Sequence, residues 1–148
     1  MHAIQQARLD HPSTFIIAIA ASQHHAYLRE LGADATFDYH SSSLVRDVQA
    51  LGRDIRKAFD CYSQGPSTAL TAQCMMPGKK TLAERSGGKK AQRRVIRTLP
   101  PRLMSGPIPA GVRTDEWIVA YTSGGKVYMS TIQFAILENW VVFVKVLI

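Results

Sequence analysis

A continuous apolar run near the start of the chain, residues 14–21, places the strongest constraint on its fold. The run reads Thr-Phe-Ile-Ile-Ala-Ile-Ala-Ala, is rich in β-branched side chains and shows no alternation of polar and apolar positions. Strands of this kind are typical of parallel sheets, in which helices cover both faces. Residues 1–10 have the pattern of the end of a helix, closed by an Asp-His-Pro-Ser break. We therefore expect a helix followed by a buried strand.

The alternation of helix and strand continues through the first two thirds of the chain. The predicted elements are a helix from Ser22 to Leu31, a strand at 35–39, a helix at 43–51, a strand at 57–62, a helix at 68–76 and a strand that begins at Lys79. This order indicates βαβ units, and 148 residues with 46% hydrophobic content can bury one core. The expected fold class is α/β, a Rossmann-like parallel sheet with flanking helices. Because residue 1 already lies in the first helix, we expect the domain to be incomplete, without the first strand and the glycine-rich turn.

The segment that follows the first predicted strand carries no carboxylate. It would correspond to the end of the second strand of a Rossmann fold, where an Asp or Glu binds the ribose hydroxyls and selects NAD, since it repels a 2′-phosphate. Here Ser22, Gln23 and His24 supply groups that can donate hydrogen bonds to a phosphate. Ser22 would also place the N-terminus of the next helix there. NADP(H) is therefore favoured over NAD(H). The alternative is that His24 and His25 are merely exposed residues in the first turn of a helix.

Several short motifs then resemble a known family. Their order in the chain is Leu-Gly-Ala-Asp-Ala-Thr-Phe-Asp-Tyr at 31–39, Ala-Phe-Asp-Cys at 58–61, Gly-Pro-Ser-Thr at 65–68, Pro-Gly-Lys at 77–79 and a run at 115–122. Over residues 1–125 the chain resembles the zinc-independent medium-chain dehydrogenases and reductases. It is most similar to the trans-acting enoyl reductases that partner fungal polyketide synthases.

This resemblance implies a cofactor domain at 1–125 and an activity. The activity would be the NADPH-dependent reduction of a carbon–carbon double bond conjugated with a carbonyl, in an enoyl or enone substrate, with a polyketide synthase as partner and without a metal. The residues that match the family's cofactor site are Ser22, Gln23, His24, Tyr39, Cys61, Tyr62, Ser63 and Thr122. Among them Tyr39 matches the tyrosine that meets the 2′-phosphate; otherwise it is an aromatic side chain packed at a strand end. No catalytic acid is identified, although Tyr62 and Ser63 carry hydroxyl groups.

A net charge of +7 leaves a second interpretation open, a non-catalytic basic binding module. Residues 86–94 are expected to form a basic surface loop. The side chains that could contact nucleic acid or another polyanion are Lys79, Lys80, Lys89, Lys90, Arg93, Arg94 and Arg97. Because the region lacks interleaved aromatic residues and a recognition motif, nucleic acid is the less favoured partner.

Residues 126–148 are expected to form an atypical apolar C-terminal tail outside the domain. Its longest uninterrupted apolar stretch, 140–144, is far shorter than the roughly 20 residues of a membrane helix, so no membrane span is expected. The cysteines, Cys61 and Cys74, have no metal-ligand spacing. We expect buried free thiols in a reducing, cytoplasmic setting.

Overall fold

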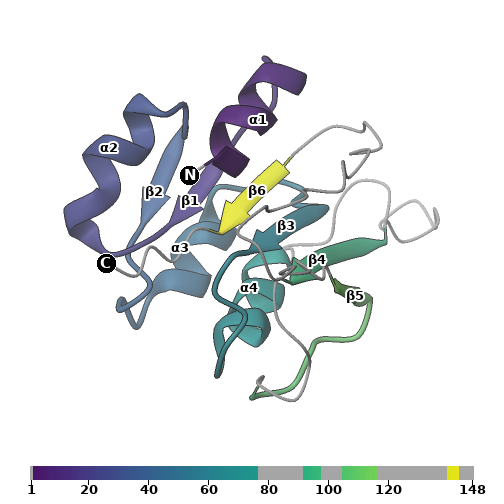
Figure 1. Cartoon of the computed structure of the whole chain (residues 1–148). Helices are drawn as coiled ribbons and strands as arrows, with labels where there is room; N and C mark the ends of the chain where they lie inside the picture. The colour runs from purple at the N-terminus through teal and green to yellow at the C-terminus, as the bar shows by residue number, and fades with distance from the viewer. Residues whose placement is uncertain (1, 77–91, 98–104, 117–139, 144–148) are drawn as a thin grey trace, which may run out of the picture.

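The computed structural model describes residues 2–76, 92–97, 105–116 and 140–143, which include one sheet of six strands in the order β2-β1-β6-β3-β4-β5 (Figure 1). Every neighbouring pair in the sheet is parallel. The strands are β1 (Ile17–Ile19), β2 (Ala35–Phe37), β3 (Lys57–Asp60), β4 (Arg93–Arg97), β5 (Val112–Glu116) and β6 (Trp140–Phe143). The helices are α1 (His2–Asp10), the 3-10 turn η1 (Ser22–His24), α2 (His25–Glu30), α3 (Leu44–Ala50) and α4 (Ser67–Met75). The predicted fold class, a Rossmann-like α/β fold with a parallel sheet and flanking helices, is confirmed.

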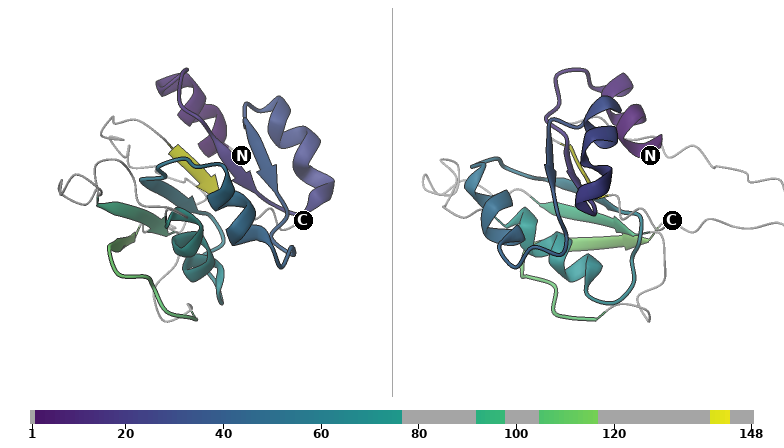
Figure 2. Two further views of the ribbon diagram at one scale, coloured as in Figure 1. Left: turned by 180° about the vertical axis from the view of Figure 1, so that it is seen from behind. Right: turned by 90° about the vertical axis from the view of Figure 1, so that its left-hand side faces the viewer.

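Helices cover both faces of the sheet, as the apolar run at 14–21 predicts. Ile16, Ala18 and Ala20 pack with residues of α1 and α2, whereas Ile17 and Ile19 pack with residues of α3 and α4. The two helix pairs lie on opposite sides of the sheet (Figure 2). Because successive side chains of a strand point to opposite faces, a run with no polar position is what a strand covered on both sides requires.

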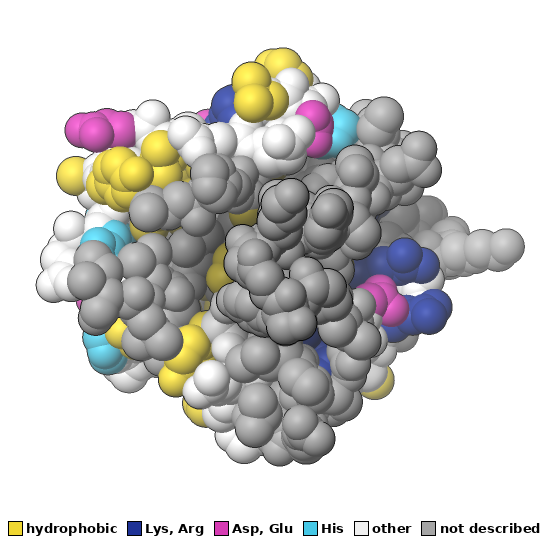
Figure 3. All heavy atoms as spheres, in the orientation of Figure 1, with side chains coloured by type: hydrophobic (Ala, Val, Ile, Leu, Met, Phe, Trp, Pro, Cys, Tyr) yellow, Lys and Arg dark blue, Asp and Glu magenta, His cyan; other side chains and the backbone are white. Residues whose placement is uncertain are grey.

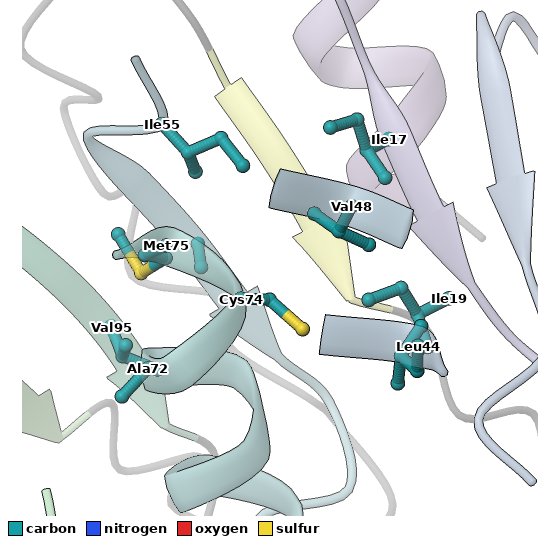
Figure 4. Close-up of a cluster of buried hydrophobic side chains, with 10 residues drawn as sticks. Ile17, Ile19, Leu44, Val48, Ile55, Ala72, Cys74, Met75 and Val95 are labelled. Carbon is teal, nitrogen blue, oxygen red and sulfur yellow. The ribbon is translucent and has the colours of Figure 1, made fainter. Parts of the chain in front are cut away.

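The larger core cluster lies under α3 and α4 (Figure 4). Leu44 and Val48 of α3 and Ile17 of β1 belong to it, all at 2% exposure or less. Burying each such side chain contributes about 1.5–3 kcal/mol relative to its exposed state. Ala72, Cys74 and Met75 of α4 and Val95 of β4 extend the same cluster, which therefore joins both halves of the sheet on this face. Cys74 is a free thiol buried in it.

The Leu-Gly-Ala-Asp segment closes α2 and fixes β2 beside β1. Gly32 has a φ of +109°, which suits a glycine that follows a helix. The carboxylate of Asp34 accepts hydrogen bonds from the Ile16 N–H at 2.7 Å and from the Arg8 guanidinium at 2.6 Å. Arg8 also donates to the carbonyl of Gly32 at 2.6 Å. These contacts join α1, β1 and β2. They give Gly32 and Asp34 a structural role in the fold.

Strand β6 occupies the middle of the sheet, where it pairs with β1 on one side and β3 on the other (Figure 1). Val141 is the partner of both Ile17 and Ala58. In doubly wound dinucleotide folds of strand order 3-2-1-4-5-6, this central place belongs to the first strand. Residues 140–143 of the predicted tail thus belong to the sheet. The predicted boundary between residues 125 and 126 lies outside the described residues and stays a prediction.

The basic segment is only partly a loop. Its last residues, Arg93 and Arg94, begin strand β4, so the prediction of a loop through residue 94 is wrong there; residues 86–91 lie outside the described residues. The Arg93 side chain is 5% exposed and donates to the Met75 carbonyl at 3.0 Å and to the Asp54 carboxylate at 3.0 Å. A guanidinium with these partners can be buried, because its charge and its donors are satisfied.

Among the described parts of the chain, no helix has the length and apolar character needed to cross a membrane. The predicted strand beginning at Lys79 and the apolar stretch at 117–121 lie outside the described residues.

The central position of β6 predicts that proline is not tolerated at Val141. Val141→Pro removes a backbone N–H from a strand paired on both sides, and we expect a loss of about 2–3 kcal/mol or more in the free energy of unfolding. Val141→Ala keeps the N–H and serves as the matched control. Urea unfolding followed by circular dichroism measures both. Equal stability of the two variants would show that residues 140–143 are not an interior strand.

Candidate functional site

A pocket opens at the carboxyl ends of β1, β2 and β3, beside α4. Its lining residues are Ile19, Tyr39, Asp60, Tyr62, Gln64, Pro66, Ser67, Leu70 and Thr71. With a volume of about 140 Å³, it is smaller than ordinary ligand pockets of about 300–1,000 Å³ and suits one part of a larger ligand. In open α/β sheets, ligands bind outside the carboxyl ends of the strands. The pocket therefore lies at the edge where this fold binds its ligands.

The buried carboxylate of Asp60 organises the wall of this pocket. Asp60 is the last residue of β3 and is 1% exposed. Its Oδ1 accepts hydrogen bonds from the Ser67 hydroxyl at 2.8 Å and from the N–H of Tyr62 at 3.1 Å, and its Oδ2 accepts one from the Thr68 hydroxyl at 2.7 Å. A buried carboxylate needs such donors in place of water. The network ties the end of β3 to the first turn of α4 and holds Tyr62 at the pocket.

Ser63 belongs to the same network and not to the open pocket. Its N–H donates to Asp60 Oδ1 at 2.9 Å, its hydroxyl donates to the Asp60 carbonyl at 2.6 Å, and it is fully buried. Its φ of +52° is unusual for a residue with a side chain, and these hydrogen bonds stabilise it. The hydroxyl of Ser63 therefore holds the turn after β3. Between Tyr62 and Ser63, the two hydroxyl-bearing candidates, only Tyr62 lines the pocket.

The other predicted site residues are divided among several places. Tyr39 lines the pocket together with Tyr62. Cys61 packs against the core cluster under α1 and α2, and burial raises the pKa of its thiol to about 12. Thr122 lies outside the described residues.

Ser22, Gln23 and His24 form η1, directly after β1. The prediction that Ser22 caps a helix is wrong, because η1 precedes α2, which begins at His25, and no side-chain cap is made. Gln23 Nε2 and His24 Nε2 lie 3.2 Å apart, whereas His25 Nε2 lies 3.0 Å from the carbonyl of Ala20. The segment thus presents polar groups at the same sheet edge as the pocket, without being part of the pocket lining.

Sequence reasoning missed one carboxylate at this edge, that of Asp38. It follows β2 and accepts hydrogen bonds from the backbone N–H of His40 at 2.9 Å and from its Nδ1 at 3.0 Å. The backbone N–H of His40 is the largest cause that lowers the pKa of Asp38, and the backbone of Ser22 contributes as well. Asp38 does not belong to the segment after the first predicted strand. The neighbouring parallel strand ends at the same edge, which is the signal that would have found Asp38.

The candidate polyanion contacts do not form a free basic surface where the structure describes them. Arg93 and Arg97 are each 4% exposed. Arg94 Nε lies 3.9 Å from the carboxylate of Asp115, which also pairs with Arg113 at 3.0 Å. Basic and acidic side chains are accordingly mixed at the β4–β5 side of the molecule (Figure 3). The four lysines of the predicted set, Lys79, Lys80, Lys89 and Lys90, lie outside the described residues.

Metal-ligating side chains do not gather in the described ranges. No group of three or more His, Cys, Asp or Glu residues within them could hold a metal ion.

Two curated proteins are similar to the chain. The trans-enoyl reductase milB of Cordyceps militaris is 29% identical over 115 residues, which is 71% of this chain and 32% of that protein. An uncharacterized protein of Saccharomyces cerevisiae, YNL134C, is 30% identical over 71 residues, 48% of this chain and 19% of that protein. The chain thus spans about a third of the length of the first relative and a fifth of the second. No protein-family model and no solved structure matches it.

The chain is therefore distantly related to an enoyl reductase. The predicted resemblance is confirmed at this level, whereas membership of the medium-chain family stays a prediction.

The Asp60 network predicts a large effect of one hydroxyl group. Thr68→Val removes the donor to Oδ2 inside the protein, and we expect a loss of about 1.5–3 kcal/mol in the free energy of unfolding. Thr71→Val is the matched control on the same helix, since the Thr71 hydroxyl donates to the carbonyl of Ser67 at 2.8 Å. Urea unfolding should show a clearly smaller loss for this control. Equal losses would contradict the role of Asp60.

Burial of the thiols predicts slow alkylation. Burial raises the pKa of both Cys61 and Cys74 to about 12, so little thiolate is present at pH 8 and iodoacetamide should react at least about 100-fold more slowly than with a free cysteine. Mass spectrometry follows each site, and the urea-unfolded protein, with its thiols exposed, is the control. Rapid labelling of either cysteine in the folded protein would refute the burial.

Proposed function

We propose that this chain forms the cofactor domain of an NADPH-dependent reductase that reduces a carbon–carbon double bond conjugated with a carbonyl. The observation that carries the proposal is the pocket at the carboxyl ends of β1, β2 and β3, in a sheet with the strand arrangement of dinucleotide-binding folds. The distant relationship to a trans-enoyl reductase supports the same reaction class. On this proposal the protein is a zinc-independent medium-chain reductase.

The adenosine part of the cofactor would lie at the described edge. Tyr39 and Tyr62 line a pocket large enough for part of a dinucleotide, and Ile19 and Leu70 supply apolar surface for a base. Ser22, Gln23 and His24 follow the neighbouring strand and would face the ribose. The hydroxyl of Tyr39 and the polar groups of η1 can donate hydrogen bonds to a 2′-phosphate. This is the basis for proposing NADP(H) over NAD(H).

The residues of the chain would bind and orient the cofactor, which when bound supplies the hydride for the β-carbon of the substrate. Positioning the hydride donor against the β-carbon of the substrate is a large part of the catalysis of such reactions. Cys61 and Tyr62 would lie along the cofactor after β3, and Ser63 would act through the turn that it stabilises. Thr122 would lie near the nicotinamide. The proton that completes the reduction at the α-carbon is not assigned to a residue.

The proposed substrate is an enoyl or enone compound, and the proposed partner is a polyketide synthase, because the relative is named a trans-enoyl reductase. The proposed location is the cytoplasm. We propose no role for nucleic acid, since Arg93 and Arg97 are buried in the sheet.

The proposal predicts a selective effect of Tyr39→Phe. Loss of a hydroxyl that donates to a charged phosphate costs about 1–2 kcal/mol, so NADPH should bind about 5–30-fold more weakly, while NADH affinity changes less than about twofold. The readout is a titration of the purified chain that follows cofactor fluorescence. Tyr27→Phe is the control, because Tyr27 is 46% exposed on α2 and lies outside the pocket lining. Tighter binding of NADH than of NADPH by the unaltered chain would refute the preference.

A further inference from the structure

The hydroxyl groups in the wall of the pocket have a fixed direction. Ser67 and Thr71 both belong to α4, and both line the pocket. The Ser67 hydroxyl donates its hydrogen to Asp60 Oδ1 at 2.8 Å, and the Thr71 hydroxyl donates its hydrogen to the Ser67 carbonyl at 2.8 Å. A hydroxyl group has one hydrogen and two lone pairs. Toward a ligand, both hydroxyl oxygens can therefore act only as hydrogen-bond acceptors.

The third polar residue of this wall, Asp60, is an acceptor as well. Its Oδ1 accepts hydrogen bonds from the N–H groups of Tyr62 and Ser63 in addition to the one from Ser67. Its Oδ2 accepts a hydrogen bond from the Thr68 hydroxyl. A carboxylate whose two oxygens both accept has no hydrogen to offer to a ligand. Asp60, Ser67 and Thr71, here called the acceptor wall, thus present acceptors alone.

The rest of the lining is apolar, aromatic or adaptable. Ile19 and Leu70 offer apolar side chains, and Tyr39 and Tyr62 offer aromatic rings at the ends of two strands. The amide of Gln64 carries both donors and an acceptor, so it adapts to a ligand of either kind. Among the described residues, no Lys, Arg or His belongs to the lining. The pocket therefore suits a flat ring, one side of which faces the acceptor wall.

An acceptor wall favours a ligand group that donates hydrogen bonds. A ligand oxygen that carried only lone pairs would face the lone pairs of Ser67 and Thr71 and would lose its water without gaining a partner. An amino group on an aromatic ring brings two N–H donors to the same place. We propose that the pocket binds an aromatic ring that carries an amino group, and that Ser67 and Thr71 accept hydrogen bonds from this group.

The two hydroxyl groups are then the specificity determinants of the pocket. The apolar side chains and the tyrosine rings hold any flat ring of suitable size, whereas the acceptor wall selects the ring by its substituent. Adenine carries such an amino group, so the inference deepens the proposed function and rests on it for the choice of ligand. The amino group of the base faces α4 in this arrangement.

The test compares adenosine with 6-methylpurine riboside, in which a methyl group of similar size replaces the 6-amino group. Both compounds are titrated into the full chain by calorimetry. We expect adenosine to bind about 10-fold more tightly, because the methyl group leaves the acceptor wall without a partner. The inference alone is overturned if the methyl compound binds as tightly as adenosine, or if neither compound binds while NADPH does. If none of the three binds, the proposed function fails and the inference fails with it.

Two variants test the assignment of the acceptors. Thr71→Val keeps the shape of the side chain and removes its oxygen, and Ser67→Ala removes the other hydroxyl. In each variant the ratio of adenosine affinity to 6-methylpurine riboside affinity should fall about threefold or more. Thr114→Val on β5, outside the lining, is the matched control and should leave the ratio unchanged.

The affinity ratio also separates recognition from stability. A smaller folded fraction affects both compounds equally, because the ratio is measured within one protein, so a purely structural role of either hydroxyl leaves it unchanged. A ratio that stays the same in both Ser67→Ala and Thr71→Val would overturn the assignment.

Discussion

Strand β6 connects the two halves of the sheet, and the rest of the structure depends on this connection. Within the described residues, β1 pairs with β2 and β6, and β3 pairs with β4 and β6, so the backbone ladder between the halves runs through Trp140–Phe143. The apolar cluster under α3 and α4 joins the halves a second time, through side chains of β1 and β4. The ladder fixes the register, and the cluster buries apolar side chains of both halves on that face.

The pocket follows from this alignment. Tyr39 comes from the end of β2, in one half, whereas Asp60 and Tyr62 come from the end of β3, in the other half. These residues can line one pocket only if the carboxyl ends of the strands lie at one edge. Parallel pairing through β6 provides that condition. Asp60 then completes the wall by replacing water with hydrogen bonds from the turn and from α4.

The helices and strands that could be predicted are those whose pattern of polar and apolar residues is visible within one short segment of the sequence. The apolar run at 14–21 indicated a strand covered on both faces, and the strand within it is Ile17–Ile19. The Ile16 carbonyl and the Ala20 N–H also bond to the backbone of the neighbouring segment at 34–37. Strand β4 was missed since its sequence, Arg-Arg-Val-Ile-Arg, has charged residues at inward positions. Those residues are buried through long-range partners such as Asp54, which no local pattern shows.

For the site, Tyr39 and Tyr62 were predicted from the resemblance of the motifs at 31–39 and 58–61 to the reductase family, and both line the pocket. Asp38, Asp60 and the residues of α4 in the pocket were missed, since their roles depend on how strands and helices meet in space. The same reason explains β6. A short apolar segment near the end of the chain has no local feature that distinguishes an exposed tail from a central strand, and only its pairing with β1 and β3 does so.

Mapping of NADPH binding onto the backbone by nuclear magnetic resonance tests the central claim most directly. The claim is that the shared carboxyl edge of β1, β2 and β3 is a nucleotide site. It predicts that amide shifts on addition of NADPH concentrate at Ser22–His24, at Tyr39 and at Tyr62. Shifts that instead follow the arginines of β4 and β5, with the carboxyl edge unchanged, would contradict it.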